Sequence, residues 1–214
     1  MLSGIAFSQN PISKTVGEFD TLKAYDLINI ELISSDDNRV EISGKNASDV
    51  VVVNSNGKLK IRMNIDEIFD GDDTFIKLYY TSFDVIDANE GAYVYSKETI
   101  EQYEVELKTQ EGGKIKLPLN VKTADFKAVT GGILELRGSV NNQDVSISTG
   151  GIFKGEELQS VTTQIAIRAG GQAWIQATEL ADIKIRAGGD VFVYGNPTKI
   201  NEDRALGGRI KRMQ

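Results

Sequence analysis

The sequence predicts an all-β fold: a single-stranded, right-handed parallel β-helix with coils of about 19 residues. Pairs of adjacent glycines recur in the second half of the chain, and successive first glycines are 19, 19, 20, 18 and 19 residues apart. Apolar and polar residues alternate on both sides of each pair, which is the period of a β-strand. The first glycines of the pairs are Gly112, Gly131, Gly150, Gly170, Gly188 and Gly207.

The segment after each glycine pair is predicted to be a strand with two inward-facing columns. The residues three positions after the first glycine are Ile115, Leu134, Phe153, Ala173 and Val191. Those five positions after it are Leu117, Leu136, Gly155, Ile175 and Val193. A second alternating run, such as Val145 and Ile147, precedes the next pair, so each coil is expected to contain two short strands. The glycines are corners, where φ is positive or a neighbouring backbone leaves no room for a Cβ.

One domain is expected over residues 11–214, with irregular coils over 11–90 and regular coils over 91–214. In the irregular part, the alternation persists without the period, as in Ile28, Ile30 and Leu32. Residues 1–10 are interpreted as the remnant of a signal peptide, because apolar and small residues precede Ser8-Gln9. The alternative is a frayed terminus.

Composition excludes several classes of function. The formal net charge of −7 repels phosphate backbones, so nucleic acid is not an expected partner. The chain has no Cys and no His, which removes thiol nucleophiles, Ser-His triads and the usual zinc, copper and haem ligands. No cofactor is expected, and the chain is expected not to be an enzyme. No run of 18 apolar residues occurs, so no transmembrane segment is expected.

An outward-facing aromatic group is the first candidate binding site. Trp174 and Phe192 fall in the same outward column of neighbouring coils, and Tyr194 lies one outward step further along the strand. Such a platform would suit a glycan or a protein partner. The alternative is an aromatic ladder that stiffens the sheet or is covered by the N-terminal segment or a second subunit.

Cations form the second candidate group. Arg168 and Arg186 fall in one column two residues before a glycine pair, with Lys184 on the same strand as Arg186. Forked guanidinium contacts would suit a carboxylated polysaccharide, and a solvated face is the alternative. Further cations crowd the last coil, where they would guard the open edge or form a basic patch. These are Arg204, Arg209, Lys211 and Arg212.

An acidic loop around Gly71 is a weak calcium candidate. Its carboxylates are Asp66, Asp70, Asp72 and Asp73. The spacing does not fit an EF-hand, because Ile68 and Lys77 stand where that loop requires oxygen ligands. An irregular calcium site and a plain acidic loop both stay open.

Several segments resemble a known bacterial family. The closing run Gly189 to Pro197 and the terminal Gly207-Gly208-Arg209-Ile210, with the succession of glycine pairs, are similar to the family called putative auto-transporter adhesin, head GIN domain. The opening Phe19-Asp20 and the alternating strands after it also resemble this family, so the likeness spans roughly residues 17–212. The resemblance implies an exported β-helical domain with an adhesive role and offers no catalytic residues.

These observations favour a noncatalytic binding module outside the cytoplasm, in the periplasm, on the outer surface or secreted. Its partner would be a glycan or a surface protein, and homo-oligomerisation stays open. One alternative is a polysaccharide lyase or hydrolase, for which Asp190, Glu135 and Lys184 are the nearest candidate residues. Another is a structural or lipid-contacting envelope protein.

Overall fold

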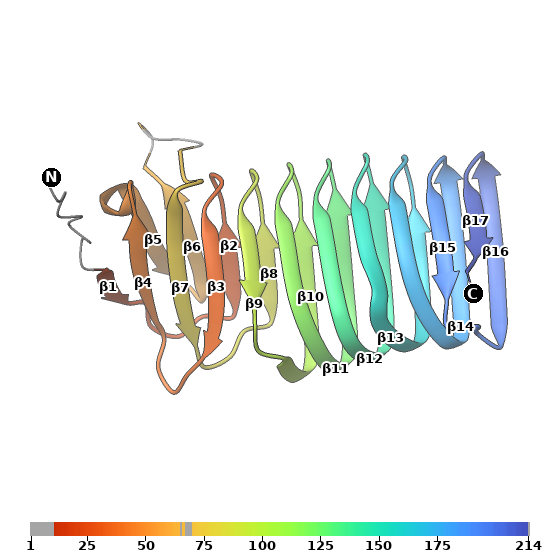
Figure 1. Cartoon of the computed structure of the whole chain (residues 1–214), viewed down its shortest axis with the longest axis horizontal. Coiled ribbons are helices and arrows are strands. Elements are labelled where there is room, and N and C mark those ends of the chain that lie inside the picture. The colour runs from red at the N-terminus through yellow and green to blue at the C-terminus, as the bar shows by residue number, and fades with distance from the viewer. Residues whose placement is uncertain (1–10, 65, 67–69, 214) are drawn as a thin grey trace, which may run out of the picture.

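The computed structural model describes residues 11–64, 66 and 70–213, and shows a β-solenoid that extends along one axis (Figure 1). Strands of successive coils pair in parallel with a regular offset, as where Lys114 pairs with Ile133 and Ile133 with Ile152. The described residues contain no α-helix, and η1 (Ala47–Asp49) is a 3-10 turn. The predicted all-β parallel solenoid with coils of about 19 residues is confirmed.

The coils are flattened, so that their strands form two faces around a shared core (Figure 1). The first face consists, in spatial order, of β1 (Ile12–Thr15), β4 (Arg39–Gly44), β7 (Thr74–Tyr80), β3 (Asn29–Ser34), β9 (Tyr93–Ser96), the first halves of β11 (Lys114–Val129), β12 (Ile133–Ser148), β13 (Ile152–Ile167) and β14 (Gln172–Ala187), then β15 (Asp190–Tyr194) and β17 (Arg209–Arg212). The second face consists of β5 (Val50–Ser55), β6 (Lys58–Met63), β2 (Thr21–Ala24), β8 (Val85–Ala88), the latter part of β10 (Ile100–Thr109), the second halves of β11 to β14, and β16 (Lys199–Leu206).

The regular coils differ from the prediction in one respect. Each of β11, β12, β13 and β14 is a single strand of 16 residues, where the sequence predicted two short ones. The two apolar runs are halves of one strand that bends around a corner while its pairing with the neighbouring coil continues. The halves are separate strands in the coils on either side of these four, as in β9 and β10 and in β15 and β16.

The paired glycines form the tight turns between coils, and their two members have different roles. All six first glycines have φ between +64° and +76°. Gly131 is typical, with φ of +72° and no atom within 4 Å of where a Cβ would stand. A Cβ on its neighbour Gly132 would lie 2.5 Å from the carbonyl oxygen of Thr109 in the preceding coil. The first glycine therefore supplies the left-handed conformation and the second permits the turns to stack.

The core between the two faces is apolar along most of its length. In the first inward column, Ile115, Leu134, Phe153, Ala173 and Val191 are all fully buried. Burying this continuous column is the main contribution that holds the coils together.

A small polar network interrupts the core in β12 and β13. Gln143 Nε2 donates to Thr163 Oγ1 at 2.8 Å, and the hydroxyls of Ser160 and Thr163 lie 2.7 Å apart. The carbonyl oxygen of the Gln143 side chain is buried and has no hydrogen-bond partner within the described part of the chain. An unpartnered buried acceptor costs stability, so these two coils depart locally from the ideal solenoid.

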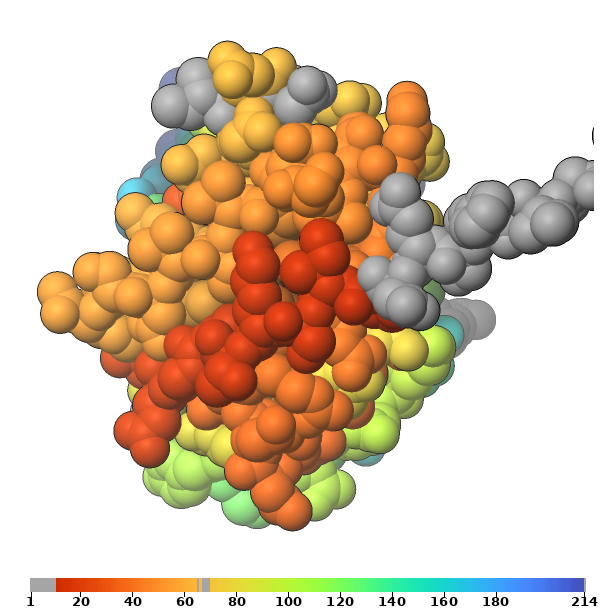
Figure 2. All heavy atoms as spheres, turned by 90° about the vertical axis from the view of Figure 1, so that its left-hand side faces the viewer, coloured from red at the N-terminus to blue at the C-terminus, as the bar shows by residue number. Residues whose placement is uncertain are grey.

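The N-terminal end is closed by antiparallel pairing, which the prediction of a parallel helix did not include. β1 pairs with β4, β4 with β7, and β5 with β6, all antiparallel. The segment from β1 to β2 crosses the end of the solenoid, where Val16 and Phe19 are buried and Asn54 Nδ2 donates to the carbonyl of Val16 at 2.8 Å. Figure 2 looks at this end and shows the first described residues, in red, lying across it. The covered end protects the strand edge.

The C-terminal end keeps an open strand edge, which carries charged residues at inward positions. Arg204 and Arg212 occupy inward positions, because they pair in register with the buried Ile185 and Val193. Both lie 3.9 Å from the carboxylate of Glu202, which also takes an inward position. Inward-pointing charges at an open edge oppose pairing with another chain, in agreement with the edge-guarding role considered for these arginines.

Candidate functional site

The predicted aromatic group assembles on the first face as a stacked ladder. Trp174 pairs in register with Phe192, and their ring centroids lie 5.0 Å apart with an angle of 10° between the planes. Lys211 Nζ lies 5.6 Å from the centroid of the Phe192 ring, in the next coil. Lys154 is the in-register neighbour of Trp174 in the preceding coil. The order along the column is therefore lysine, tryptophan, phenylalanine, lysine.

This geometry changes the interpretation of the aromatic group. The rings of Trp174 and Phe192 face one another, and Lys211 covers the far side of Phe192. Their flat faces do not form a shared platform parallel to the sheet, and their edges are what they present outward. Tyr194 lies beside them on β15 but pairs with Gln176. The stiffening ladder, left open as the alternative to a platform, is the arrangement that the geometry favours.

The predicted cationic row does not join the aromatic group. Lys184 belongs to the second half of β14, so its side chain projects from the second face, and it lies 3.5 Å from Asp182. Arg186 Nη2 lies 2.9 Å from Asp203. Arg168 is exposed and forms no ion pair with any residue that the structure describes. The structure thus splits the six sequence-predicted binding residues between the two faces.

The acidic loop around Gly71 uses its carboxylates locally. Asp70 Oδ2 accepts a hydrogen bond from Asn46 Nδ2 at 2.7 Å, and Asp72 Oδ1 accepts one from the backbone amide of Asp73 at 3.0 Å. The backbone amide of Asp66 donates to Asn64. Over residues 11–64, 66 and 70–213, no group of three or more acidic side chains is arranged to hold a metal ion.

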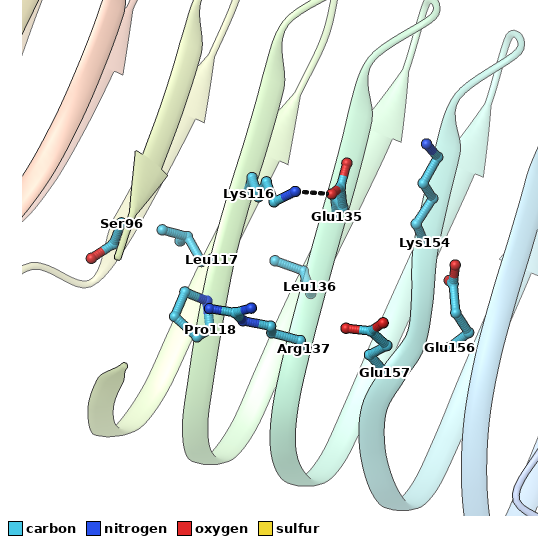
Figure 3. A pocket seen from close by; sticks show the side chains of 10 residues that line it. All are labelled: Ser96, Lys116, Leu117, Pro118, Glu135, Leu136, Arg137, Lys154, Glu156 and Glu157. Atoms are coloured by element: carbon cyan, nitrogen blue, oxygen red, sulfur yellow. Dashed lines mark ion pairs between the residues drawn. The ribbon is translucent and has the colours of Figure 1, made fainter. Parts of the chain in front are cut away.

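A groove of about 280 Å³ lies on the first face where β11, β12 and β13 approach the corner (Figure 3). Buried apolar residues lie beneath it, and its walls carry charges of both signs. The lining residues are Ser96, Lys116, Leu117, Pro118, Glu135, Leu136, Arg137, Lys154, Glu156 and Glu157. Lys154 places one side of the groove next to Trp174, so the groove and the aromatic ladder adjoin.

A bulge in β13 shapes this groove. The register between β12 and β13 shifts after Glu135 pairs with Lys154, so that Arg137 pairs with Glu157. Between β13 and β14, pairing jumps from Gly155 to Gln159. The extra residues leave Leu158 fully buried and turn Glu156 and Glu157 outward. Bulges of this kind redirect side chains and occur frequently beside functional sites.

The core packing beneath the bulge differs from that of the neighbouring coils. Gly155 occupies the inward column in which other coils place Leu136 and Ile175, and a Cβ there would lie 2.4 Å from the Phe153 ring. Phe153 therefore fills the space that a larger residue at this position would take, and it stacks on Phe126 with centroids 5.5 Å apart. The bulge is a packed element of the fold, since no void replaces the missing side chain.

The charges of the groove divide into paired and unpaired groups. Glu135 accepts contacts from Lys116 and, at 3.1 Å, from Lys114. The hydrogen bond from Lys116, helped by Lys114, holds the pKa of Glu135 below its usual range despite partial burial. In the described part of the chain, Arg137, Lys154, Glu156 and Glu157 take part in no ion pair. Figure 3 shows Glu157 extending from β13 toward Arg137. These four side chains are the ones available to a ligand.

Sequence reasoning missed this groove, although the spacing of the glycines contained a signal. The interval from Gly150 to Gly170 is 20 residues and the next is 18, and Gly155 breaks an otherwise apolar column. A coil with an added residue followed by one with a residue fewer is what a local bulge produces. The charged lining residues could not be found this way, because each appears in the sequence as an ordinary solvated residue.

The second face differs in chemistry. Glu106, Asp125 and Asp144 stack in register in three successive coils. Burial, together with the charges of Asp144 and Glu106, raises the pKa of Asp125. No outward aromatic residue occurs on this face in β8, in β10 from Glu104 onward, in the second halves of β11 to β14, or in β16. The exposed Tyr103 lies at the corner.

A parallel β-solenoid with one chemically distinct face defines a class of repeat-built scaffolds that present an extended surface. The chain belongs to the family described as Putative auto-transporter adhesin, head GIN domain, whose model matches residues 18–197. The resemblance noted in the sequence is thereby confirmed. None of the curated proteins matches the chain.

Solved structures of similar fold come from species of Bacteroides and Parabacteroides. A putative adhesin from Bacteroides fragilis matches with a TM-score of 0.85 at 17% identity, covering 98% of this chain and 100% of that one. A putative adhesin from Parabacteroides distasonis matches with a TM-score of 0.77 at 16% identity, covering 95% and 96%. A putative lipid binding protein from the same species has a TM-score of 0.69 at 16% identity, covering 96% and 97%. At these identities the likeness establishes the fold.

Within residues 11–64, 66 and 70–213, no helix is long and apolar enough to cross a bilayer.

Proposed function

We propose that this chain is a noncatalytic binding module that acts outside the cytoplasm and holds a glycan or protein partner on its first face. The family name supports an adhesive role at the cell surface, in the periplasm or in the medium.

The distribution of outward aromatic residues is the observation that carries this proposal. Aromatic side chains are enriched at protein and sugar interfaces because they bury a large area at low entropic cost. Seven project outward from strands of the first face: Phe75, Tyr79, Tyr93, Tyr95, Trp174, Phe192 and Tyr194. The corresponding strands of the second face carry charged and small residues. The first face is therefore the better suited of the two to a partner.

A second candidate function is cleavage of a polysaccharide, which the carboxylates and cations of the groove favour. The residues first considered for such chemistry do not come together. Asp190 accepts two hydrogen bonds from Arg209, at 2.7 and 2.6 Å, and Glu135 is held by two lysines. Lys184 lies on the other face. Catalysis in the groove would have to use Glu156 or Glu157 with Arg137 or Lys154.

Binding and turnover measured together test both functions. Immobilised protein would be exposed to neutral and acidic saccharides, to surface proteins and to lipid vesicles, with product release monitored in the same samples. We expect saturable binding to a saccharide or a protein without product. Product formation would establish the enzymatic alternative, and binding to vesicles alone would favour a lipid-contacting role, which one structural neighbour's name suggests for that neighbour.

A further inference from the structure

The groove at the β13 bulge has the composition of a site for an uncharged, hydroxyl-rich ligand. Its unpaired charged groups are two cations, Arg137 and Lys154, and two carboxylates, Glu156 and Glu157. Arginine and lysine can only donate hydrogen bonds, and ionised carboxylates can only accept them. A sugar hydroxyl does both, so neighbouring donors and acceptors can satisfy the same hydroxyl group. Charge-assisted hydrogen bonds of this type are the stronger ones.

The charge balance argues against an anionic ligand at the groove. The four unpaired groups cancel, and Lys116 is already engaged by Glu135. The whole chain carries a formal net charge of −7, which disfavours the approach of a polyanion. Arg186, considered from the sequence as a partner for a carboxylated polysaccharide, is paired with Asp203. A neutral ligand meets none of these electrostatic costs.

The shape of the groove agrees with a short saccharide. Its volume of about 280 Å³ is near the lower end of the range of roughly 300–1,000 Å³ found for small-molecule sites. Leu117, Leu136 and Pro118 lie beneath the groove and are buried. Beyond Lys154 the ladder of Trp174 and Phe192 adds apolar ring edges along the solenoid axis.

We propose that the groove between β11, β12 and the β13 bulge binds a neutral saccharide, with Arg137 and Lys154 donating to its hydroxyls and Glu156 and Glu157 accepting from them. This inference rests on the proposed binding function and names the ligand class and the site. The groove lies where β13 shifts its register against both neighbouring strands, which turns Glu156 and Glu157 outward.

Two exposed substitutions test the site without touching the core. Arg137→Ala removes a donor and Glu157→Ala removes an acceptor, and both side chains are exposed. Lys127→Ala is the matched control, because Lys127 is exposed on the second face. The probes are neutral oligosaccharides of hexoses and N-acetylhexosamines, with a polyuronate as the charged comparison, and Kd is measured by calorimetry at low and high salt.

We expect a neutral oligosaccharide to bind with little salt dependence, and each groove substitution to weaken binding about tenfold or more, as loss of a charge-assisted hydrogen bond predicts. The Lys127→Ala variant should bind like the parent. If both groove variants bind as tightly as the parent, the site is overturned while the binding function stands. Preference for the polyuronate, or binding to a protein alone, would overturn the ligand class, and no binding to any probe or protein would overturn both proposals.

Discussion

The two faces of the solenoid are made by the same coils and share one core, yet they have become chemically different. Inward residues obey the repeat on both sides, since packing against neighbouring coils constrains them equally. Outward residues are free of that constraint. The first face uses this freedom for aromatic residues, a bulge and a groove, whereas the second carries a stack of carboxylates. This contrast is the reason for placing the proposed partner on the first face.

The largest effect is expected from removing the residue that supports the groove from beneath. Phe153→Ala would leave a cavity below Gly155 and break the stack with Phe126. Truncation of a fully buried phenylalanine costs about 3–5 kcal/mol of unfolding free energy, which urea denaturation would measure. Phe75→Ala, at a side chain that is 53% exposed on the first face, is the matched control and should cost less than about 1 kcal/mol. Equal losses of unfolding free energy for the two variants would contradict the packing described for the bulge.

An intermediate loss of unfolding free energy is expected for an outward residue of the first face, and a smaller one for an outward residue of the second. Trp174→Ala removes a half-buried ring and its stacking on Phe192, and we expect a loss of about 1–2 kcal/mol in unfolding free energy. Lys184→Ala removes an exposed pair with Asp182 on the second face and should cost less than about 0.5 kcal/mol. If both substitutions have the same small effect, the aromatic ladder does not stiffen the first face.

The smallest effect is on the pH dependence of the unfolding free energy, and it should have opposite signs for a carboxylate on each face. The pKa of Glu135 is lowered by Lys116, so its ion pairs stabilise the fold above the unfolded pKa, and this contribution is lost as the pH falls through the folded pKa. The pKa of Asp125 is raised by burial and by Asp144, so its ionisation destabilises the fold as the pH rises above the unfolded pKa.

Two isosteric substitutions would show this difference. Glu135→Gln should lower stability at pH 7, and Asp125→Asn should raise it, each by a few tenths of a kcal/mol. Both differences from the parent should vanish in acid, where the parent carboxyls are protonated as well. Thermal unfolding followed across pH would measure this, and shifts of the same sign for both variants would show that the electrostatic contrast between the faces is absent.

The sequence was sufficient to predict the regular repeat and insufficient to predict the places where the structure departs from it. Glycine spacing predicted the turns and the inward columns, because a positive φ and a close backbone leave a direct mark on residue choice. The antiparallel end was missed, since β4 and β7 are distant in the sequence and only their pairing reveals it. Asn56-Gly57 between β5 and β6, with φ of +49° and +76°, was an unused hairpin signal.

The candidate site shows the same limit. Register alone predicted that Trp174 and Phe192 would be neighbours, and the structure places them so. The angle between their rings decides whether they form a platform or a ladder, and no sequence pattern contains it. Arg137 and Glu157 are brought together by a shifted register, which depends on how Gly155 and Phe153 share the core.

Blocking one face at a time tests the central claim most directly. The chain has no cysteine, so Gln172→Cys on the first face and Gln164→Cys on the second each provide a unique thiol at an exposed glutamine. Each thiol would be coupled to a polyethylene glycol chain, and binding measured to the panel member that the unmodified protein binds. Blocking at residue 172 should abolish binding while blocking at residue 164 leaves it intact. Loss of binding on blocking the second face alone would contradict the assignment of the partner surface to the first.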